Sequence, residues 1–182
     1  MDPELKIDCE RVYLRRLKLK DASDIYTQIN DPEVVRWTTR IPHPYPEGGA
    51  EKFIRQSHYR WRKGTDYIFG IIHKSSGRLI GVISLGNVFL RHGCAELGFW
   101  LGRESWNRGY MTEAARAVTR FAVRELGLYR IYASAFEANP AAGKVLENCG
   151  FKLEGVMREA VVREGKRQNF LNYGLLKSEL PG

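Results

Sequence analysis

The chain has 182 residues, of which 43% are hydrophobic and 27% are charged, as is ordinary for a soluble globular protein. No apolar run approaches the roughly 20 residues of a membrane span, and the polar N-terminus lacks the apolar core of a signal peptide, so we expect no membrane segment and a cytoplasmic location. The formal net charge is +8, but the basic residues are scattered without a long Lys/Arg block, so we do not expect direct nucleic-acid binding.

Cysteine usage and the lack of internal boundaries limit the possibilities further. Cys9, Cys94 and Cys149 are odd in number and lack metal-ligand spacing, so we expect thiols in a reducing compartment and no metal site. No repeat or linker divides the chain. We therefore expect one domain over residues 1–182, with a core of about residues 10–177.

The N-terminal part of the chain predicts a strand and two short helices. Val12–Leu17 alternates as a strand does, Asp21 and Asp24 are candidates for the cap of a first helix, and Asp31-Pro32 begins a second. Residues 40–49 follow, with three prolines at alternate positions that exclude a regular helix or an inner strand. This segment is either an exposed connector or one wall of a ligand site, because loops often carry function.

The middle of the chain predicts an antiparallel meander. An amphipathic helix covers residues 50–63, and apolar strands follow at residues 67–72 and 79–85. The Arg91-His92-Gly93 turn then leads into the strand Cys94–Leu101, which is apolar except for Glu96.

Residues 106–113, with the sequence WNRGYMTE, predict a turn from this strand into a long helix. Apolar residues recur at helical spacing from Met111 to Ala122, with arginines on the opposite side. Gly109 stands where the helix begins, and glycine lets a ligand approach the backbone closely. The first amides of a helix lack internal partners and carry the positive end of its dipole, so this turn predicts an anion site suited to phosphate.

The last third of the chain adds a strand over residues 129–136, a helix that Asn139-Pro140 caps and starts, and a hairpin from residues 152–162 and 170–176. Antiparallel strands, then strand–helix–strand–helix, then a hairpin indicate an α+β fold. The sequence has no Walker A loop and no dinucleotide-binding glycine motif, so neither common phosphate-binding fold is expected.

Two segments resemble the GNAT superfamily of acyl-CoA N-acyltransferases, and within it the RimJ/RimL branch. Residues 95–113 are similar to that branch's wording of the motif Q/R-x-x-G-x-G/A, with Trp106 in the first position and Gly109 in place. Met111 departs from the pattern, which has a small residue there. Residues 139–151, from Asn139-Pro140 to Gly150-Phe151, resemble a second family segment. The resemblance spans nearly the whole chain, from Tyr13 to Lys177.

The resemblance implies a mixed, mostly antiparallel sheet flanked by helices, in which the strands at residues 96–101 and 129–136 splay apart to form an acetyl-CoA cleft. The amides of residues 107–112 would hold the coenzyme pyrophosphate, and the strand edge at residues 99–101 would pair with the pantetheine arm. The implied acetyl-CoA-binding residues are Phe99, Trp100, Leu101, Trp106, Asn107, Arg108, Gly109, Tyr110, Met111, Thr112, Asn139, Ala142 and Lys144. Asn139 has a second interpretation as a helix cap, and Lys144 as a solvated lysine.

Glu96 is the candidate catalytic residue. An amine must be uncharged to attack a thioester, so the site needs a route for the ammonium proton, and Glu96 is a carboxylate on an otherwise apolar strand. The alternative is a structural glutamate. The superfamily often uses a tyrosine or a serine as general acid, but those positions here hold Leu146 and Ala142, so no acid is carried over. Trp37 and Tyr45 are candidates for contact with the acceptor, although most such aromatics serve packing.

We therefore predict an acetyl-CoA-dependent N-acetyltransferase whose amine acceptor attacks the thioester directly in a ternary complex. A protein α-amine is about a tenth free base at neutral pH and lysine far less, so a lightly equipped site favours a protein N-terminus. The family analogy suggests a ribosomal protein. The sequence leaves the oligomeric state open, with a homodimer among the options. The alternatives are a small-molecule amine such as a polyamine or an antibiotic, or a non-catalytic coenzyme-A- or nucleic-acid-binding protein.

Overall fold

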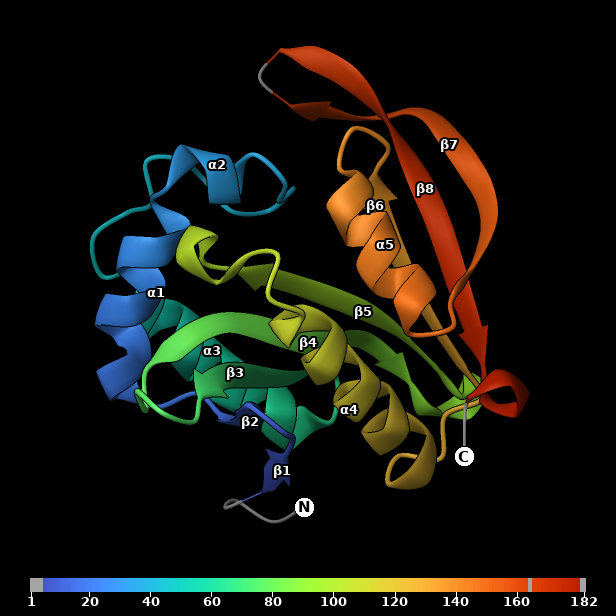
Figure 1. Cartoon of the computed structure of the whole chain (residues 1–182), viewed down its shortest axis with the longest axis horizontal. Coiled ribbons are helices and arrows are strands. Elements are labelled where there is room, and N and C mark those ends of the chain that lie inside the picture. Colours follow the sequence, from blue (N-terminus) through green and yellow to red (C-terminus); the bar gives the residue numbers. More distant parts are fainter. Residues whose placement is uncertain (1–4, 164, 181–182) are drawn as a thin grey trace.

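A computed structural model describes residues 5–163 and 165–180 and shows one eight-stranded mixed sheet with helices packed on it (Figure 1). The strand order is β1-β2-β3-β4-β5-β6-β8-β7. The strands are β1 (Lys6–Asp8), β2 (Val12–Arg16), β3 (Tyr67–His73), β4 (Leu79–Phe89), β5 (Cys94–Leu101), β6 (Arg130–Phe136), β7 (Lys152–Arg163) and β8 (Lys166–Leu176). The α-helices are α1 (Ala22–Ile29), α2 (Pro32–Val35), α3 (Gly49–Lys63), α4 (Tyr110–Arg124) and α5 (Pro140–Asn148). The predicted α+β class is confirmed.

The sheet consists of two antiparallel parts that meet at one short parallel pairing. β5 and β6 pair only at Cys94–Arg130, Ala95–Ile131 and Glu96–Tyr132. Beyond Glu96, β5 continues to pair with β4 alone, and beyond Tyr132, β6 pairs with β8 alone. The predicted splaying of these two strands is therefore present. Glu96 lies at the point where β5 and β6 separate, which we call the fork.

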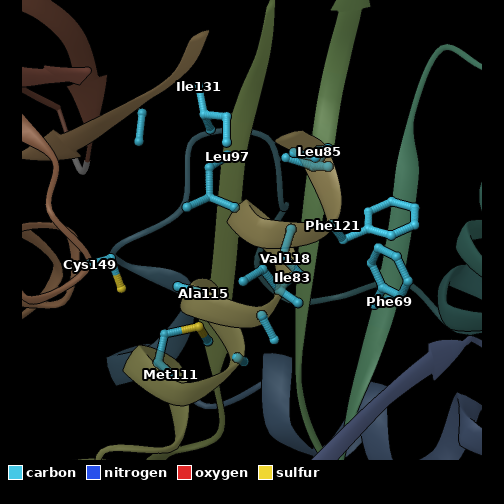
Figure 2. Close-up of a cluster of buried hydrophobic side chains, with 14 of the residues drawn as sticks. Phe69, Ile83, Leu85, Leu97, Met111, Ala115, Val118, Phe121, Ile131 and Cys149 are labelled. Carbon is cyan, nitrogen blue, oxygen red and sulfur yellow. The ribbon is translucent and has the colours of Figure 1, made fainter. Parts of the chain in front are cut away.

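Helix α4 holds the larger core together. Its apolar side chains recur every three or four residues and lie fully buried against the strands on one face of the sheet. Figure 2 shows Val118 and Phe121 of α4 beside Ile83 and Phe69 of the sheet. A second cluster, on the other face, packs α1 and the first half of α3 against β3 and β4 through residues such as Ile25 and Ile54. The two clusters pack on opposite faces of the strands that lead to the fork.

Several local features differ from the sequence-based expectations, among them β8, which begins at Lys166 rather than at Phe170. β1 was not predicted, because three residues are too short for a periodic signal. Asp21 lies at the start of α1 but does not cap it; its carboxylate instead accepts two hydrogen bonds from Arg15, at 2.7 and 2.8 Å. β4 runs four residues past Leu85, through a bulge that contains Asn87.

The described residues contain no helix long and apolar enough to cross a membrane. They also contain no group of three or more His, Cys, Asp or Glu residues placed to hold a metal ion. The three cysteines are unpaired thiols. Burial raises the pKa of Cys9 and of Cys149 to about 11, so both stay protonated at neutral pH.

Candidate active site

The turn before α4 presents a row of unpaired backbone amides. Asn107 and Gly109 have left-handed backbones, with φ of 57° and 78°, which turn the chain sharply into the helix. The N–H groups of residues 107–112 have no hydrogen-bond acceptor among the described residues; the first amide of α4 with a backbone partner is that of Glu113, which donates to the Gly109 carbonyl at 3.1 Å. Successive free amides at a helix N-terminus form a concave donor surface for an anion.

Contacts between Glu113 and the start of β2 hold this turn in place, and we call these contacts the Glu113 clamp. The Glu113 carboxylate accepts hydrogen bonds from the backbone N–H of Arg11 at 2.7 Å and of Val12 at 3.2 Å. The Arg11 side chain also donates to Glu113, at 3.0 Å, and to the Arg108 carbonyl, at 2.8 Å. Burial raises the pKa of Glu113, but these hydrogen bonds outweigh it and hold its pKa below the ordinary value. The clamp was not predicted, because it joins residues about a hundred positions apart.

The larger side chains that flank this turn, Trp106, Tyr110 and Met111, pack against the protein. Trp106 Nε1 donates to the Leu101 carbonyl at 2.7 Å, and the Tyr110 hydroxyl lies 3.1 Å from His73 Nε2. Met111 is 5% exposed and points into the core below the turn (Figure 2). The Thr112 carbonyl accepts from the Cys149 thiol at 3.6 Å. The large side chain of Met111 therefore does not obstruct the approach to the amides, whereas Asn107, Arg108 and Gly109 are exposed.

The end of β5 offers its backbone rather than its side chains. Phe99 and Leu101 belong to the α4-facing core, while Trp100 packs on the opposite face against the α1–α3 cluster. Because β6 has already turned away, one edge of this segment has no neighbouring strand. A linear ligand with amide groups can pair with such an edge.

Glu96 lies at the fork with two partners that the sequence did not reveal. The Asn87 side chain donates to Glu96, with Nδ2 and Oε2 2.8 Å apart, and Asn87 has a left-handed backbone with φ of 48°. Tyr132 is the cross-strand neighbour of Glu96 on β6. Burial, then the charge of Glu96, raises the pKa of Tyr132, so its hydroxyl stays protonated at neutral pH. An asparagine with positive φ in a bulge can be recognised as a neighbour of this half-buried carboxylate only when the register of β4 and β5 is known.

The α5 candidates differ in what they do. Asn139 caps the helix, because its Oδ1 accepts from the Ala142 amide at 3.3 Å. Ala142 is half-buried against the core and Lys144 is exposed. Tyr173 of β8 is 3% exposed beneath α5, where a side chain at Gly143 would meet its hydroxyl at 2.8 Å.

The two aromatic candidates for acceptor contact lie in different places. The Trp37 ring lies edge-on to Phe136 of β6, with ring centroids 6.0 Å apart. Tyr45 instead packs against the α1–α3 cluster, and its backbone N–H donates to Asn30 at 2.7 Å. Trp37 thus faces the part of the sheet beyond the fork, on the same side as Glu96, whereas Tyr45 supports the proline-rich segment at residues 40–49.

A sheet that forks between two parallel strands, with free helix-terminal amides beside it, matches the N-acyltransferase fold that the sequence resembles. The chain belongs to the acetyltransferase (GNAT) domain family, whose model matches residues 11–152. It is an acetyl-CoA-dependent N-acetyltransferase of the GNAT type. The site described above is compatible with this donor, because a pyrophosphate is bound through several N–H groups and those of residues 107–112 have no acceptor among the described residues.

Relatives and solved structures agree with this assignment. The uncharacterized N-acetyltransferase p20 of Bacillus licheniformis is 29% identical over 173 residues, 95% of this chain and 97% of that protein. The [ribosomal protein uS5]-alanine N-acetyltransferase of Escherichia coli is 27% identical, over 90% of this chain and 87% of that protein. The fold matches Mycobacterium smegmatis RimJ in complex with CoA-disulfide, with a TM-score of 0.89, 21% identity and coverage of 99% and 90%. It also matches spermidine N-acetyltransferase from Vibrio cholerae, with a TM-score of 0.81, 21% identity and coverage of 93% and 97%.

Proposed function

We propose that this acetyltransferase modifies the N-terminal α-amine of a protein, and that a ribosomal protein is its acceptor. The observation that carries the proposal is the position of Glu96, a half-buried carboxylate at the point where β5 and β6 separate. The name of the Escherichia coli relative supports the acceptor class. The apparatus for proton transfer otherwise looks sparse, because Leu146 and Ala142 occupy the positions where family members carry an acid.

Acetyl-CoA supplies an activated acyl group, and this chain's residues hold it. The amides of residues 107–112 bind the pyrophosphate, and the free edge of β5 at residues 99–101 pairs with the pantetheine arm. A β5 amide there also polarises the thioester carbonyl. Asn139 and Ala142 border the arm from the start of α5. Lys144 is exposed one turn further along α5, and in this proposal it neutralises phosphate charge.

Glu96 accepts the proton of the acceptor ammonium, directly or through one water. Its side chain lies on the face of β5 opposite α4, because alternate residues Ala95 and Leu97 face the α4 core. The amine therefore reaches the fork from the side away from the pyrophosphate turn. The departing thiolate has an acidity like that of cysteine and takes its proton from water. An α-amine suits this site better than lysine, since more of it is already uncharged at neutral pH.

Intact-mass spectrometry with paired peptides tests the proposal. One set has free N-termini, and the other is N-blocked with an internal lysine; spermidine is included as a small amine. Acetyl addition to the free N-termini alone is the expected result. Faster transfer to the blocked lysine peptides, or transfer to spermidine and to neither peptide set, would contradict it.

We also propose that the protein forms a homodimer through the first half of β7. This strand is at the edge of the sheet, and it exposes the apolar side chains of Leu153, Val156 and Met157. An exposed apolar edge strand is a ready partner for a second copy. Light scattering should give twice the mass of the chain, and replacement of Val156 by lysine should halve it; a monomer at micromolar concentration would refute the interface.

A further inference from the structure

We propose that Arg163 and Gln168, at the end of the β7–β8 hairpin, form a subsite that binds a carboxylate on the acceptor peptide. The inference rests on the proposed function, because it requires a peptide acceptor. It adds a chemical preference to that function: an Asp or Glu side chain a few residues after the acetylated N-terminus.

The Arg163 side chain is anchored by one hydrogen bond and has hydrogen-bonding capacity left over. Its Nη2 donates to the carbonyl of Val35, the last residue of α2, at 2.9 Å. In Figure 1 the hairpin extends from the far part of the sheet towards α2, and this contact joins the two. The Nε of Arg163 is buried and has no hydrogen-bond partner among the described residues. A buried donor without an acceptor costs about 1–3 kcal/mol, so a ligand that supplies the acceptor gains that energy.

Gln168 is a second unsatisfied group on the same face. Its Oε1 is also buried without a partner within the described part of the chain. Gln168 pairs with Val161, and Arg163 follows Val161 by two residues, so both side chains project to the same side of the hairpin. A peptide offers both complements, since a carboxylate accepts from Arg163 and a backbone N–H donates to Gln168.

The space beside Arg163 suits an anion. A hollow of about 270 Å³ is lined by Pro32, Val35, His43 and Arg163, which include two potential donors and no carboxylate. Two described acidic residues of α2 and β7 have other partners: Glu33 pairs with Arg36 at 3.3 Å, and Glu159 lies 4.0 Å from Arg167. No described carboxylate forms an ion pair with Arg163. The Arg163 Nε–H has no acceptor among the described residues, and a planar guanidinium binds a carboxylate through parallel N–H···O hydrogen bonds.

One continuous face connects this subsite to Glu96. Directly paired residues on neighbouring strands have their side chains on the same face of the sheet, as do residues two or four apart on one strand. The pairs Glu96–Tyr132 and Phe136–Phe170 therefore lie on one face. Gln168, two residues before Phe170 on β8, lies on that face as well. Trp37 packs on Phe136 in the middle of this face. Along the strands, the path from the Glu96–Tyr132 pair covers six residues to Gln168 and eight to Arg163. At ~3.3 Å per residue these are lengths of roughly 20 and 26 Å. An extended acceptor whose amine lies at the fork therefore reaches Arg163 within about its first eight residues.

The test is a position scan. Neutral twelve-residue peptides with free N-termini carry one Asp, or one Asn at the same place, moved from residue 3 to residue 10, and kcat/KM is measured for each. The wild type should prefer Asp over Asn about tenfold at one position within the first eight residues, and less elsewhere. Arg163→Met should bring the Asp/Asn ratio near one. Arg163→Lys should keep part of the preference, because the positive charge remains but the planar guanidinium with its parallel hydrogen bonds is lost.

Lys166→Met is the matched control, because Lys166 pairs with Arg163 across the hairpin and is exposed. It should keep the Asp preference. An equal loss in both variants would assign the effect to the general positive field and overturn the subsite. Equal rates for Asp and Asn peptides at every position in the wild type would also overturn it, while leaving N-terminal acetylation intact. Transfer to none of these peptides would instead refute the acceptor class itself.

Discussion

The side-chain amide of Asn87 donates a hydrogen bond to the carboxylate of Glu96, with Nδ2 and Oε2 2.8 Å apart. Asn87 achieves this from a left-handed backbone in the β4 bulge, with φ of 48°. That conformation costs of the order of 1–3 kcal/mol for most residues and less for asparagine. A strained residue whose side chain reaches the candidate base points to a positioning role.

Asn87 therefore predicts a contribution of Glu96 positioning to turnover. Its amide holds the Glu96 carboxylate through a hydrogen bond, so the carboxylate is less well placed to accept the proton of the amine when the donor is removed. Asn87→Gly keeps the backbone conformation and removes the donor, and Asn87→Asp removes it and adds a like charge that repels the carboxylate. With a free-N-terminus peptide, kcat should fall about tenfold in the glycine variant and further in the aspartate variant.

Other groups near the carboxylate do not change in this comparison. Tyr132 faces Glu96 from β6, Cys94 lies two residues away on β5, and Asp66 lies near Gly86, the cross-strand partner of Glu96 on β4. All three are present in every variant and serve as a constant background. Equal kcat in the wild type and the two variants would show that Asn87 does not position the group that governs the rate.

Gly109 predicts a specific loss of donor binding. Alanine at φ of 78° is strained by about 1–2 kcal/mol, and its Cβ would lie 3.2 Å from the Arg11 guanidinium. We expect Gly109→Ala to raise the Kd for acetyl-CoA about tenfold by calorimetry. Gly127→Ala is the matched control, because Gly127 has φ of 66° with no atom within 4 Å of a new Cβ. Equal Kd values for acetyl-CoA in the two variants would show that the turn at Gly109 does not take part in binding acetyl-CoA.

Glu113 predicts an acid-sensitive contribution to stability. Its side chain is 14% exposed, and its folded pKa is lowered, so its contribution is complete above the unfolded value of about 4.5 and is lost as the pH falls below that. Glu113→Gln should lower the free energy of unfolding by about 1–3 kcal/mol at pH 7, and urea titrations should show that difference shrinking towards pH 3.5. Glu125→Gln, at the exposed far end of α4, should change little. A Glu113 deficit that is constant with pH would be incompatible with a charged clamp.

The sequence was sufficient for the elements whose signals are local. Hydrophobic periodicity predicted β5 at Cys94–Leu101, and the Asn139-Pro140 pair predicted the start of α5. Gly109 predicted the sharp turn before α4, because a positive φ at that position favours glycine.

What the sequence did not give depends on contacts between distant residues. The bulge at Asn87 arises from the pairing of β4 with β5, and the Glu113 clamp joins residues 102 apart. Arg163 and Val35 are 128 residues apart, so no local pattern marks them as partners. Trp37 and Tyr45 were grouped by residue type, but only Trp37 lies beyond the fork.

The most direct test of the account is the replacement of Glu96 by Gln, which keeps the shape and the hydrogen-bonding reach of the side chain while removing the base. Turnover with a free-N-terminus peptide and the Kd of acetyl-CoA should be measured on the same preparation. We predict that kcat falls at least about 100-fold, the usual contribution of a general base, while the Kd changes less than about threefold. Unchanged turnover would make Glu96 a structural residue of the fork and would refute the mechanism.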